Sequence, residues 1–303
     1  MKRYKDFASD GGSNIVGQVV DQQTRLRSRL ASVKHTVAVM SGKGGVGKSA
    51  VTVNLASALS LQGYRLGILD ADINGPSIAK MTGIQRSAFS IQHSAFKNGL
   101  PPAIGFLGLR VISMDLFLPD EETPVTWDAP TQKEAYVWRG TMEMTTLREF
   151  LTDTEWGDLD YLLIDLPPGT DRLPNIAGLL PQLSGTLILT IPSEVSQAVV
   201  KKSITLAKEH LKTPVIGLIE NMKGYVCPHC GKIGELFHST GILTCEEMAK
   251  NLGIPYLGVI PFDSQISLTT DEGKPFMEEF GDSSAGKAFI SIAQKIKSFF
   301  DDG

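Results

Sequence analysis

The stretch Ser41-Gly42-Lys43-Gly44-Gly45-Val46-Gly47-Lys48-Ser49 contains a complete G-x4-G-K-S loop of the kind that binds phosphate groups. The apolar run 37–40 leads into the loop and residues 54–59 follow with helical spacing, so the motif lies between a strand and a helix. Glycines let backbone N–H groups turn toward phosphate oxygens, and the start of the helix adds the positive end of its dipole. The residues expected to line a nucleotide are Gly42, Lys43, Gly44, Gly45, Val46, Gly47, Lys48, Ser49 and Ala50.

Two lysines and one serine of this loop have distinct expected roles. Lys48 should reach the β- and γ-phosphates, and the hydroxyl of Ser49 should ligate Mg2+. Lys43 could be solvated, or it could reach phosphate oxygens of a nucleotide held nearby or across a dimer interface.

The composition indicates one large domain. The 303 residues are 42% hydrophobic, which is ample for a core, and their net charge of −4 gives no general attraction to nucleic acid. We expect an α/β domain over residues 34–303, preceded by an extension over residues 1–33. No apolar run approaches the length of a membrane span and the N-terminus lacks a signal-peptide core, so we expect a cytoplasmic protein.

Strand-like apolar runs alternate with helical patterns along the chain. This alternation predicts an α/β fold, a mostly parallel twisted sheet with helices on both faces. The expected strands are His35–Met40, Arg65–Leu69, Leu109–Met114, Tyr161–Ile164, Gly185–Ile191, Val215–Ile219 and Tyr256–Val259. Residues 86–108 and 119–133 lack clear periodicity, and we expect them to be surface excursions.

Three helices follow from apolar spacing. One is expected over Ser193–Leu211, capped by Ser193 and directing Val195 and Val200 toward the sheet. The last, Ala288–Phe300, should pack on the sheet, with a membrane-surface helix as the alternative. Residues 14–30 could form an amphipathic helix docked on the main body or a flexible tail.

Acidic residues follow two of the expected strands. Asp70 and Asp72 end the second strand, where side chains at the carboxyl edge can face the phosphates, and Asp70 could help to hold the following loop. Asp165 ends the buried run 161–164 and should hold Mg2+ or its waters. Gly169 can approach the γ-phosphate closely because it has no side chain.

The segment Cys227-Pro228-His229-Cys230-Gly231 suggests metal chemistry. Two thiolates three residues apart can bind one metal centre, and both Zn2+ and iron–sulfur clusters favour such ligands. A [4Fe-4S] cluster held by thiolates needs four of them, which a symmetric dimer supplies as one pair from each chain. The alternatives are a structural zinc site that adds His238 and Cys245, and a dithiol redox pair, which the loop-like surroundings do not favour.

Lys43 together with Lys48 makes the loop resemble the deviant Walker A motif of nitrogenase iron protein, MinD and ParA. Over about residues 34–265 the chain resembles the Mrp/Nbp35 iron–sulfur cluster carriers, because its motifs follow in the same order. After the loop these motifs are 72–77, 166–170, 220–222 and the C-P-H-C-G segment. The resemblance implies a homodimer that closes on ATP, with slow hydrolysis coupled to cluster loading or release.

The resemblance also implies roles for single residues. Lys43 would cross to the partner's nucleotide and Asp72 would position the attacking water. Asn221, Pro261 and Asp263 would lie at the base of the nucleotide. Cys227 and Cys230 would bind a labile [4Fe-4S] cluster that bridges two chains, arrives from a cluster donor and passes to recipient apo-proteins.

One departure from that family and one alternative function stand beside this interpretation. The family commonly has Gly-Thr-Gly-Asp where this chain has Gly169-Thr170-Asp171-Arg172, which affects the expected geometry and hydrolysis rate of that loop. The alternative is a MinD- or ParA-like positioning ATPase with a structural zinc site, which has no need of Cys227 and Cys230 as carriers of a cluster.

Overall fold

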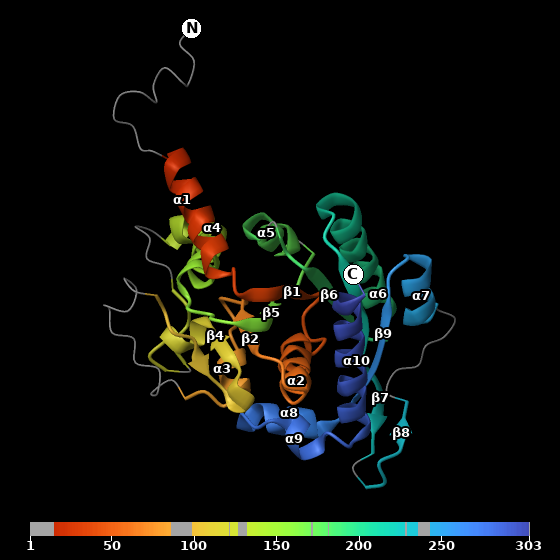
Figure 1. Cartoon of the computed structure of the whole chain (residues 1–303). Helices are drawn as coiled ribbons and strands as arrows, with labels where there is room; N and C mark the ends of the chain where they lie inside the picture. The colour runs from red at the N-terminus through yellow and green to blue at the C-terminus, as the bar shows by residue number, and fades with distance from the viewer. Residues whose placement is uncertain are drawn as a thin grey trace, which may run out of the picture.

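A computed structural model describes residues 15–85, 99–120, 122–126, 132–170, 172–180, 182–227, 229–235 and 243–302. Within these residues the protein has one nine-stranded sheet, which is mostly parallel (Figure 1). Its strands in spatial order are β3 (Ala103–Ile104), β4 (Arg110–Ile112), β2 (Leu66–Asp70), β5 (Leu159–Asp165), β1 (Val33–Ser41), β6 (Gly185–Thr190), β7 (Val215–Val226) and β8 (Ile233–Gly234), with β9 (Tyr256–Phe262) also paired to β7.

All seven strands expected from the sequence are present, and the two additional strands are short and antiparallel. β3 pairs with β4 at one edge and β8 pairs with the end of β7 at the other. Each spans only two residues, which is too short to produce an alternating pattern. β7 also extends seven residues beyond the predicted end at Ile219, to Val226.

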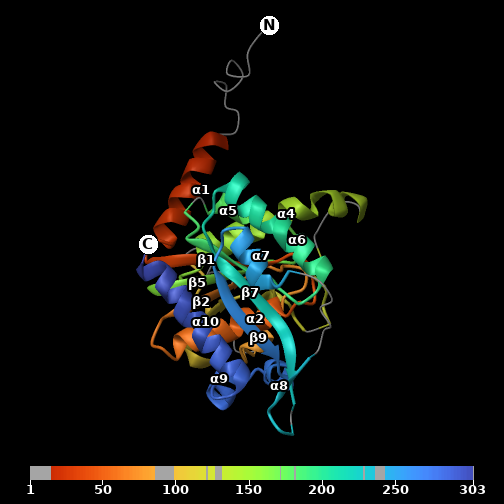
Figure 2. The same cartoon turned by 90° about the vertical axis from the view of Figure 1, so that its right-hand side faces the viewer.

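Helices cover both faces of the sheet, as Figures 1 and 2 show. Alternate residues of β1 point to opposite faces: Ala38 and Met40 join one apolar core, and Val37 and Val39 join the other. The first core is covered by α1 (Ile15–Arg29), α4 (Gln132–Asp153), α5 (Arg172–Leu179), α6 (Glu194–Thr205) and α7 (Cys245–Asn251). The second is covered by α2 (Lys48–Ser60), α3 (Ile78–Met81), α8 (Ser264–Glu272), α9 (Phe276–Phe280) and α10 (Ser284–Asp301).

Three irregular helices complete the described elements. Phe106–Gly108 and Met114–Phe117 are short 3-10 helices, and Leu206–Leu211 continues α6 as a π-helix. The predicted excursion 86–108 therefore includes β3 and a helical turn near its end, whereas residues 86–98 lie outside the described residues.

The sequence predictions for α6 need one correction. Ser193 occupies the N-cap position, but its side chain makes no capping hydrogen bond. Val200 is buried as predicted, whereas Val195 is 67% exposed. Val195 lies in the first turn of α6, outside the buried residues of that helix, so the apolar spacing there does not correspond to a buried face.

The two terminal helices both pack on the body of the protein. α10 buries Phe289, Ile292 and Ile296 against the second core, which supports the packed helix over the membrane-surface alternative. α1 contacts α4 and buries Leu26 in the first core, so residues 15–29 form the docked helix of the two alternatives. In the described part of the chain, no helix combines the length and apolar character needed to cross a bilayer.

Candidate functional site

The glycine-rich loop joins the end of β1 to the start of α2 at the centre of the sheet. Gly45 and Gly47 each have a φ of +77°, which glycine adopts without strain. A Cβ on Gly47 would lie 2.6 Å from Nδ2 of Asn221, and a Cβ on Gly42 would lie 2.6 Å from Cγ1 of Val199. The loop needs glycine both for its backbone conformation and for close packing against β7 and α6.

The first turn of α2 leaves its backbone donors open to an anion. Gly47 is the N-cap residue, and no side chain caps this 13-residue helix. The leading N–H groups and the positive end of the helix dipole therefore face the carboxyl edge of the sheet, where phosphate would bind.

Asp165, at the end of β5, is the centre of a compact polar cluster. Its carboxylate lies 2.6 Å from Nζ of Lys48 and accepts hydrogen bonds from Oγ of Ser49 at 2.6 Å and from Oγ1 of Thr52 at 2.7 Å. Asp165 has no exposed surface, so these groups stabilise its charge in place of water. Sequence reasoning missed Thr52, although its position four residues after Lys48, on one face of α2, was an available signal.

The oxygen atoms of this cluster fit a magnesium ion. Oγ of Ser49 and Oδ2 of Asp165 are 2.6 Å apart, beside the open end of α2. Mg2+ prefers oxygen ligands and usually combines one or two carboxylates with substrate phosphates and water. Ser49 and Asp165 could therefore hold the ion while the nucleotide supplies its other ligands.

Asp70 is buried beside this cluster and organises the loop that follows β2. Its Oδ2 accepts hydrogen bonds from the backbone N–H of Ser77 at 2.9 Å, the N–H of Ile78 at 3.1 Å and the hydroxyl of Ser113 at 2.9 Å. Burial and then the charge of Asp165 raise the pKa of Asp70 to about 7. Asp70 is thus a loop-holding residue; its partner Ser113, on a distant segment, carried no sequence signal.

Asp72 lies within the same loop and is half-buried. Its Oδ1 accepts a hydrogen bond from the N–H of Gly75 at 3.2 Å, which closes the tight turn. The second carboxylate oxygen has no hydrogen-bond donor within the described part of the chain. Asp72 is therefore available for a water-positioning role at the carboxyl edge, which remains a prediction.

The loop after β5 lies against the start of the glycine-rich loop. The N–H of Gly169 donates to the carbonyl of Ser41 at 3.1 Å, and Gly169 has a φ of +124°. A Cβ on Gly44 would lie 3.8 Å from Cγ of Pro168. The structure thus brings the predicted Gly169 next to the expected phosphate position; Asp171 of the same loop lies outside the described residues.

Lys43 is half-buried and holds the loop through its backbone. Its carbonyl accepts a hydrogen bond from Oγ of Ser41 at 3.0 Å. Among the residues that the structure describes, none accepts a hydrogen bond from its ammonium group. The side chain of Lys43 is therefore free to reach an anion supplied from outside this chain.

A cavity of about 240 Å3 adjoins the glycine-rich loop between β7, α2 and α8. Asn221 lines it, is buried, and donates from Nδ2 to the carbonyl of Val46 at 2.8 Å. The predicted Ala50, Pro261 and Asp263 also line this cavity. Asp263 caps α8 by accepting the N–H of Gln265 at 3.0 Å, so part of its role is structural.

The cysteine pair lies at the tip of a hairpin formed by β7 and β8. Tyr225 and Val226 of β7 pair with Gly234 and Ile233 of β8. Two backbone hydrogen bonds close the turn: the N–H of Gly231 donates to the carbonyl of Cys227 at 2.8 Å, and the N–H of Cys227 donates to the carbonyl of Lys232 at 2.9 Å. We refer to residues 222–235 as the cysteine arm.

Both cysteines of the arm are accessible. Cys230 is exposed and Cys227 is partly exposed, and neither forms a disulfide. Hydrogen bonds from the backbone of His229 and then from Cys230 lower the pKa of Cys227, which favours the thiolate form that binds metals. Within the described residues no group of three or more His, Cys, Asp or Glu side chains is arranged to hold a metal ion.

Cys245 does not join this pair. It is fully buried at the start of α7, and Nε2 of Gln197 donates to its Sγ at 3.5 Å. Burial and then the charge of Glu220 raise the pKa of Cys245 to about 12. Cys245 is therefore a core thiol and does not join Cys227 and Cys230 in a zinc site within one chain. The fourth residue of that alternative, His238, lies outside the described residues.

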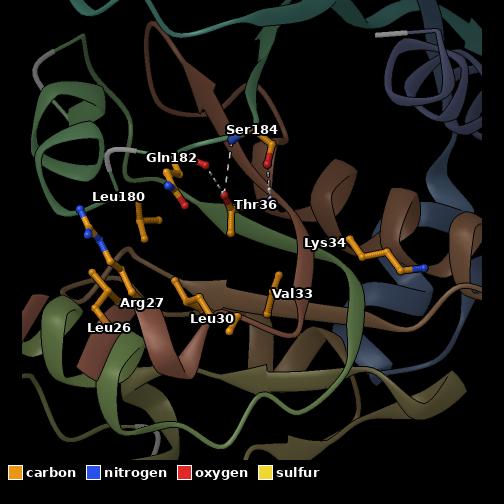
Figure 3. Close-up of a pocket in the computed structure, with 10 residues that line it drawn as sticks. Leu26, Arg27, Leu30, Val33, Lys34, Thr36, Leu180, Gln182 and Ser184 are labelled. Carbon is orange, nitrogen blue, oxygen red and sulfur yellow. Dashed lines mark hydrogen bonds between the residues drawn. The ribbon is translucent and has the colours of Figure 1, made fainter. Parts of the chain in front are cut away.

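A second cavity, of about 220 Å3, lies at the opposite end of β1, beneath α1 (Figure 3). Leu26 of α1 and Leu30, in the turn directly after α1, form one wall, and Thr36 and Ser184 lie across from them. The N–H of Thr36 donates to Oγ of Ser184 at 3.0 Å, and Oγ1 of Thr36 donates to the carbonyl of Gln182 at 3.4 Å. These polar groups satisfy one another, so we assign this cavity to the docking of α1.

The comparisons with known proteins match this architecture. The family model for the ParA-type NUBPL iron-transfer P-loop NTPases matches residues 32–297. An iron–sulfur cluster carrier protein of Methanocaldococcus jannaschii is 42% identical over 279 residues, which cover 92% of this chain and 89% of that protein. The cytosolic Fe-S cluster assembly factor NUBP2 of Bos taurus is 39% identical over 272 residues, which cover 89% of this chain and 94% of that protein.

Solved structures of other proteins share the fold of this chain. A nucleotide-binding protein from Archaeoglobus fulgidus in complex with ADP aligns with a TM-score of 0.66 and 37% identity, covering 84% of this chain and 92% of that one. The cell division ATPase MinD of Pyrococcus furiosus aligns with a TM-score of 0.60 and 21% identity over 88% of this chain and 99% of its own. The second likeness is one of fold alone.

Proposed function

This chain belongs to the NUBPL iron-transfer P-loop NTPase family, and from that premise we propose that it is an ATP-dependent iron–sulfur cluster carrier. Two chains form a homodimer and hold a [4Fe-4S] cluster, as cargo, between their Cys227 and Cys230 pairs. The cluster is received from a donor and passed to apo-proteins in the cytoplasm.

The observation that carries this proposal is the isolated, accessible thiol pair at the tip of the cysteine arm. Cys227 and Cys230 supply two ligands, and the described residues provide no third one nearby. A [4Fe-4S] cluster needs four, and a two-fold axis beside the arm supplies them as two identical pairs. The positioning ATPase with a structural zinc site is not favoured, because the relatives of high coverage are cluster carriers and Cys245 is a core thiol.

The nucleotide part of the proposal rests on the cluster around Asp165. Lys48 would bind the β- and γ-phosphates, while Ser49 and Asp165 would hold Mg2+, which supplies positive charge at the phosphates. Asp72 would orient the attacking water, and Gly169, which has no side chain, would lie close to the terminal phosphate. Lys43, with no acceptor in the described part of its own chain, would reach the nucleotide of the partner subunit.

A single strand connects the nucleotide site with the thiols. β7 carries Asn221, which holds the glycine-rich loop through Val46, and continues to Val226, next to Cys227. Between them Met222 has a φ of +58°, and the pairing of β7 with β9 shifts register between Asn221 and Tyr225. We propose that ATP binding and hydrolysis alter the relation of the two cysteine arms through this strand, and so regulate loading or release.

Metal analysis of anaerobically purified protein tests the carrier function. The wild type should contain about four iron and four sulfide per dimer after reconstitution, and Cys227→Ala/Cys230→Ala should contain neither. Cys245→Ala is the matched control, because it removes a thiol outside the pair and should keep the cluster. Zinc near one per chain with no reconstituted cluster, or a cluster that survives loss of both arm thiols, would overturn the proposal.

A further inference from the structure

A buried carboxylate on α4 connects the two loops that flank the expected terminal phosphate. Oε1 of Glu143 accepts a hydrogen bond from Nδ2 of Asn74 at 2.5 Å, and Oε2 accepts one from Nη1 of Arg172 at 3.2 Å. Asn74 belongs to the loop after β2, and Arg172 begins α5 directly after the loop that follows β5. One oxygen of the carboxylate thus binds the loop after β2, and the other binds the residue at which the loop after β5 enters α5.

The two loops carry groups that are expected to act together on the nucleotide. Asn74 lies two residues after Asp72, and Arg172 lies three residues after Gly169, whose N–H is anchored on Ser41. At their bases the loops are already in register, because Asp70 and Asp165 are paired on adjacent strands. Beyond those strand ends, Glu143 provides a contact common to both.

Glu143 comes from a rigid element rather than from either loop. α4 buries Leu147 and Phe150 in the first core, one and two turns after Glu143. The side chain of Glu143 is 10% exposed and that of Arg172 is 34% exposed, so solvent reaches their ion pair only from the side of the arginine. A partly buried charged pair is costly to break on one side, because the remaining charge stays out of water.

We propose that Glu143 is a positioning residue for ATP hydrolysis. It fixes the position of the loop after β2, through Asn74, relative to the loop after β5, through Arg172. Asp72 and Gly169 then reach the terminal phosphate as a unit. Glu143 does not touch the nucleotide and acts through Asn74 and Arg172. The inference rests on the proposed ATPase function of this same site.

The first test separates hydrolysis from nucleotide binding. ADP lacks the terminal phosphate, so its dissociation constant in Glu143→Ala should stay within about twofold of the wild type, while kcat falls about tenfold. Glu143→Gln keeps the volume of the side chain and can retain one of the two contacts. Its kcat should therefore lie between those of the wild type and of Glu143→Ala. Glu149→Gln, an exposed change on the same helix, is the matched control and should leave both quantities unchanged.

A mutant cycle tests whether the two loops are coupled through Glu143. Asn74→Ala and Arg172→Ala should each lower kcat, and their double variant should lose less than the product of the two single effects. In the Glu143→Ala background the same two substitutions should have no further effect. Multiplicative effects in both backgrounds, unchanged kcat in Glu143→Ala, or a parallel loss of ADP affinity and melting temperature would overturn the inference.

Hydrogen exchange distinguishes failure of this inference from failure of the proposed function. In the protein without nucleotide, Glu143→Ala should speed exchange in residues 72–77 and 166–170 together, whereas Glu149→Gln should not. If the wild type does not hydrolyse ATP, the proposed function fails. The exchange experiment still shows whether Glu143 holds the two loops together. Faster exchange in one loop alone, or in neither, would refute it.

Discussion

Asp70 and Asp165 lie opposite each other on the neighbouring strands β2 and β5, both out of contact with solvent. Asp165 is compensated by Lys48 and two hydroxyls, whereas Asp70 is held by backbone N–H groups and Ser113. Among the described residues, Asp70 therefore has no cation beside it, and burial followed by the charge of Asp165 raises its pKa.

Stability of the nucleotide-free protein should fall between about pH 4 and pH 7 because of Asp70. Its pKa is raised from 3.8 to about 7, so the folded state retains a proton that the unfolded chain loses, and this contribution disappears as pH rises through 7. Asp70→Asn should remove the dependence, which is at most about 4 kcal/mol. Thermal unfolding in EDTA across this range, with Asp282→Asn as control, measures it; equal pH profiles for wild type and Asp70→Asn would contradict the prediction.

Lys48→Ala should weaken ATP and ADP binding by about 10- to 100-fold, because a charged hydrogen bond to phosphate contributes about 1.5–3 kcal/mol. Titration calorimetry checks this, with the exposed Lys201→Ala as control. Reconstituted iron and sulfide should match the wild type, since the cysteine arm is untouched. Normal ATP hydrolysis in Lys48→Ala would show that the phosphate site is assigned wrongly.

Asn221→Ala should weaken ADP and ATP binding equally, by about five- to tenfold, because it removes a hydrogen bond of about 1–1.5 kcal/mol that holds the loop at Val46. The value of kcat at saturating ATP should change little. This pattern is the reverse of that expected for Glu143→Ala, and the two variants are best measured side by side. A fall in kcat with unchanged affinity would contradict the assignment of Asn221 to the binding cavity.

Thiol labelling should separate the cysteine arm from Cys245. Cys230 is exposed and Cys227 has a lowered pKa, whereas Cys245 is buried with a pKa of about 12. At pH 8 the arm thiols of the metal-free protein should react with iodoacetamide about 100-fold faster than Cys245, which should react only on unfolding. Mass spectrometry of quenched samples gives the three rates; early labelling of Cys245 would contradict its burial.

Leu26→Ala should destabilise the docked α1 by about 2 kcal/mol, because Leu26 is buried beside the cavity of Figure 3. Proteolysis within the first 33 residues should become faster, while ADP affinity should not change because the cavity is at the opposite end of β1. Gln23→Ala, exposed on the same helix, is the control. Equal proteolysis rates for Leu26→Ala and wild type would show that α1 does not depend on this contact.

Local patterns were enough to predict the sheet and the phosphate loop. A buried strand, a glycine-rich turn and a helix are adjacent in sequence, so their chemistry is visible without contacts. Asp165 was found in the same way, because a carboxylate after a buried strand marks the carboxyl edge. The spacing of Cys227 and Cys230 indicated a metal centre by itself, and the resemblance to cluster carriers added the expectation of a transferable [4Fe-4S] cluster.

Contacts between distant segments could not be predicted in this way. Ser113 binds Asp70 across 43 residues and Glu143 binds Asn74 across 69, and neither has a spacing that marks a site. The two-residue β8 is defined by its pairing with β7 rather than by its composition. Val195 shows the opposite limit, since helical spacing alone predicted that its side chain is buried, whereas it is exposed.

The cysteine arm follows directly after Asn221, which holds the loop at Val46. Tyr225 of the arm pairs with Phe262 of β9, two cross-strand pairs join β7 to β8, and Ile233 approaches Gly224 closely. With two thiols, one arm supplies only half of the ligands of a [4Fe-4S] cluster. In the proposed dimer, the angle between the two arms would set the positions of the four thiolates. The affinity for the cluster would therefore change when whole subunits rotate, while the ligand residues stay the same.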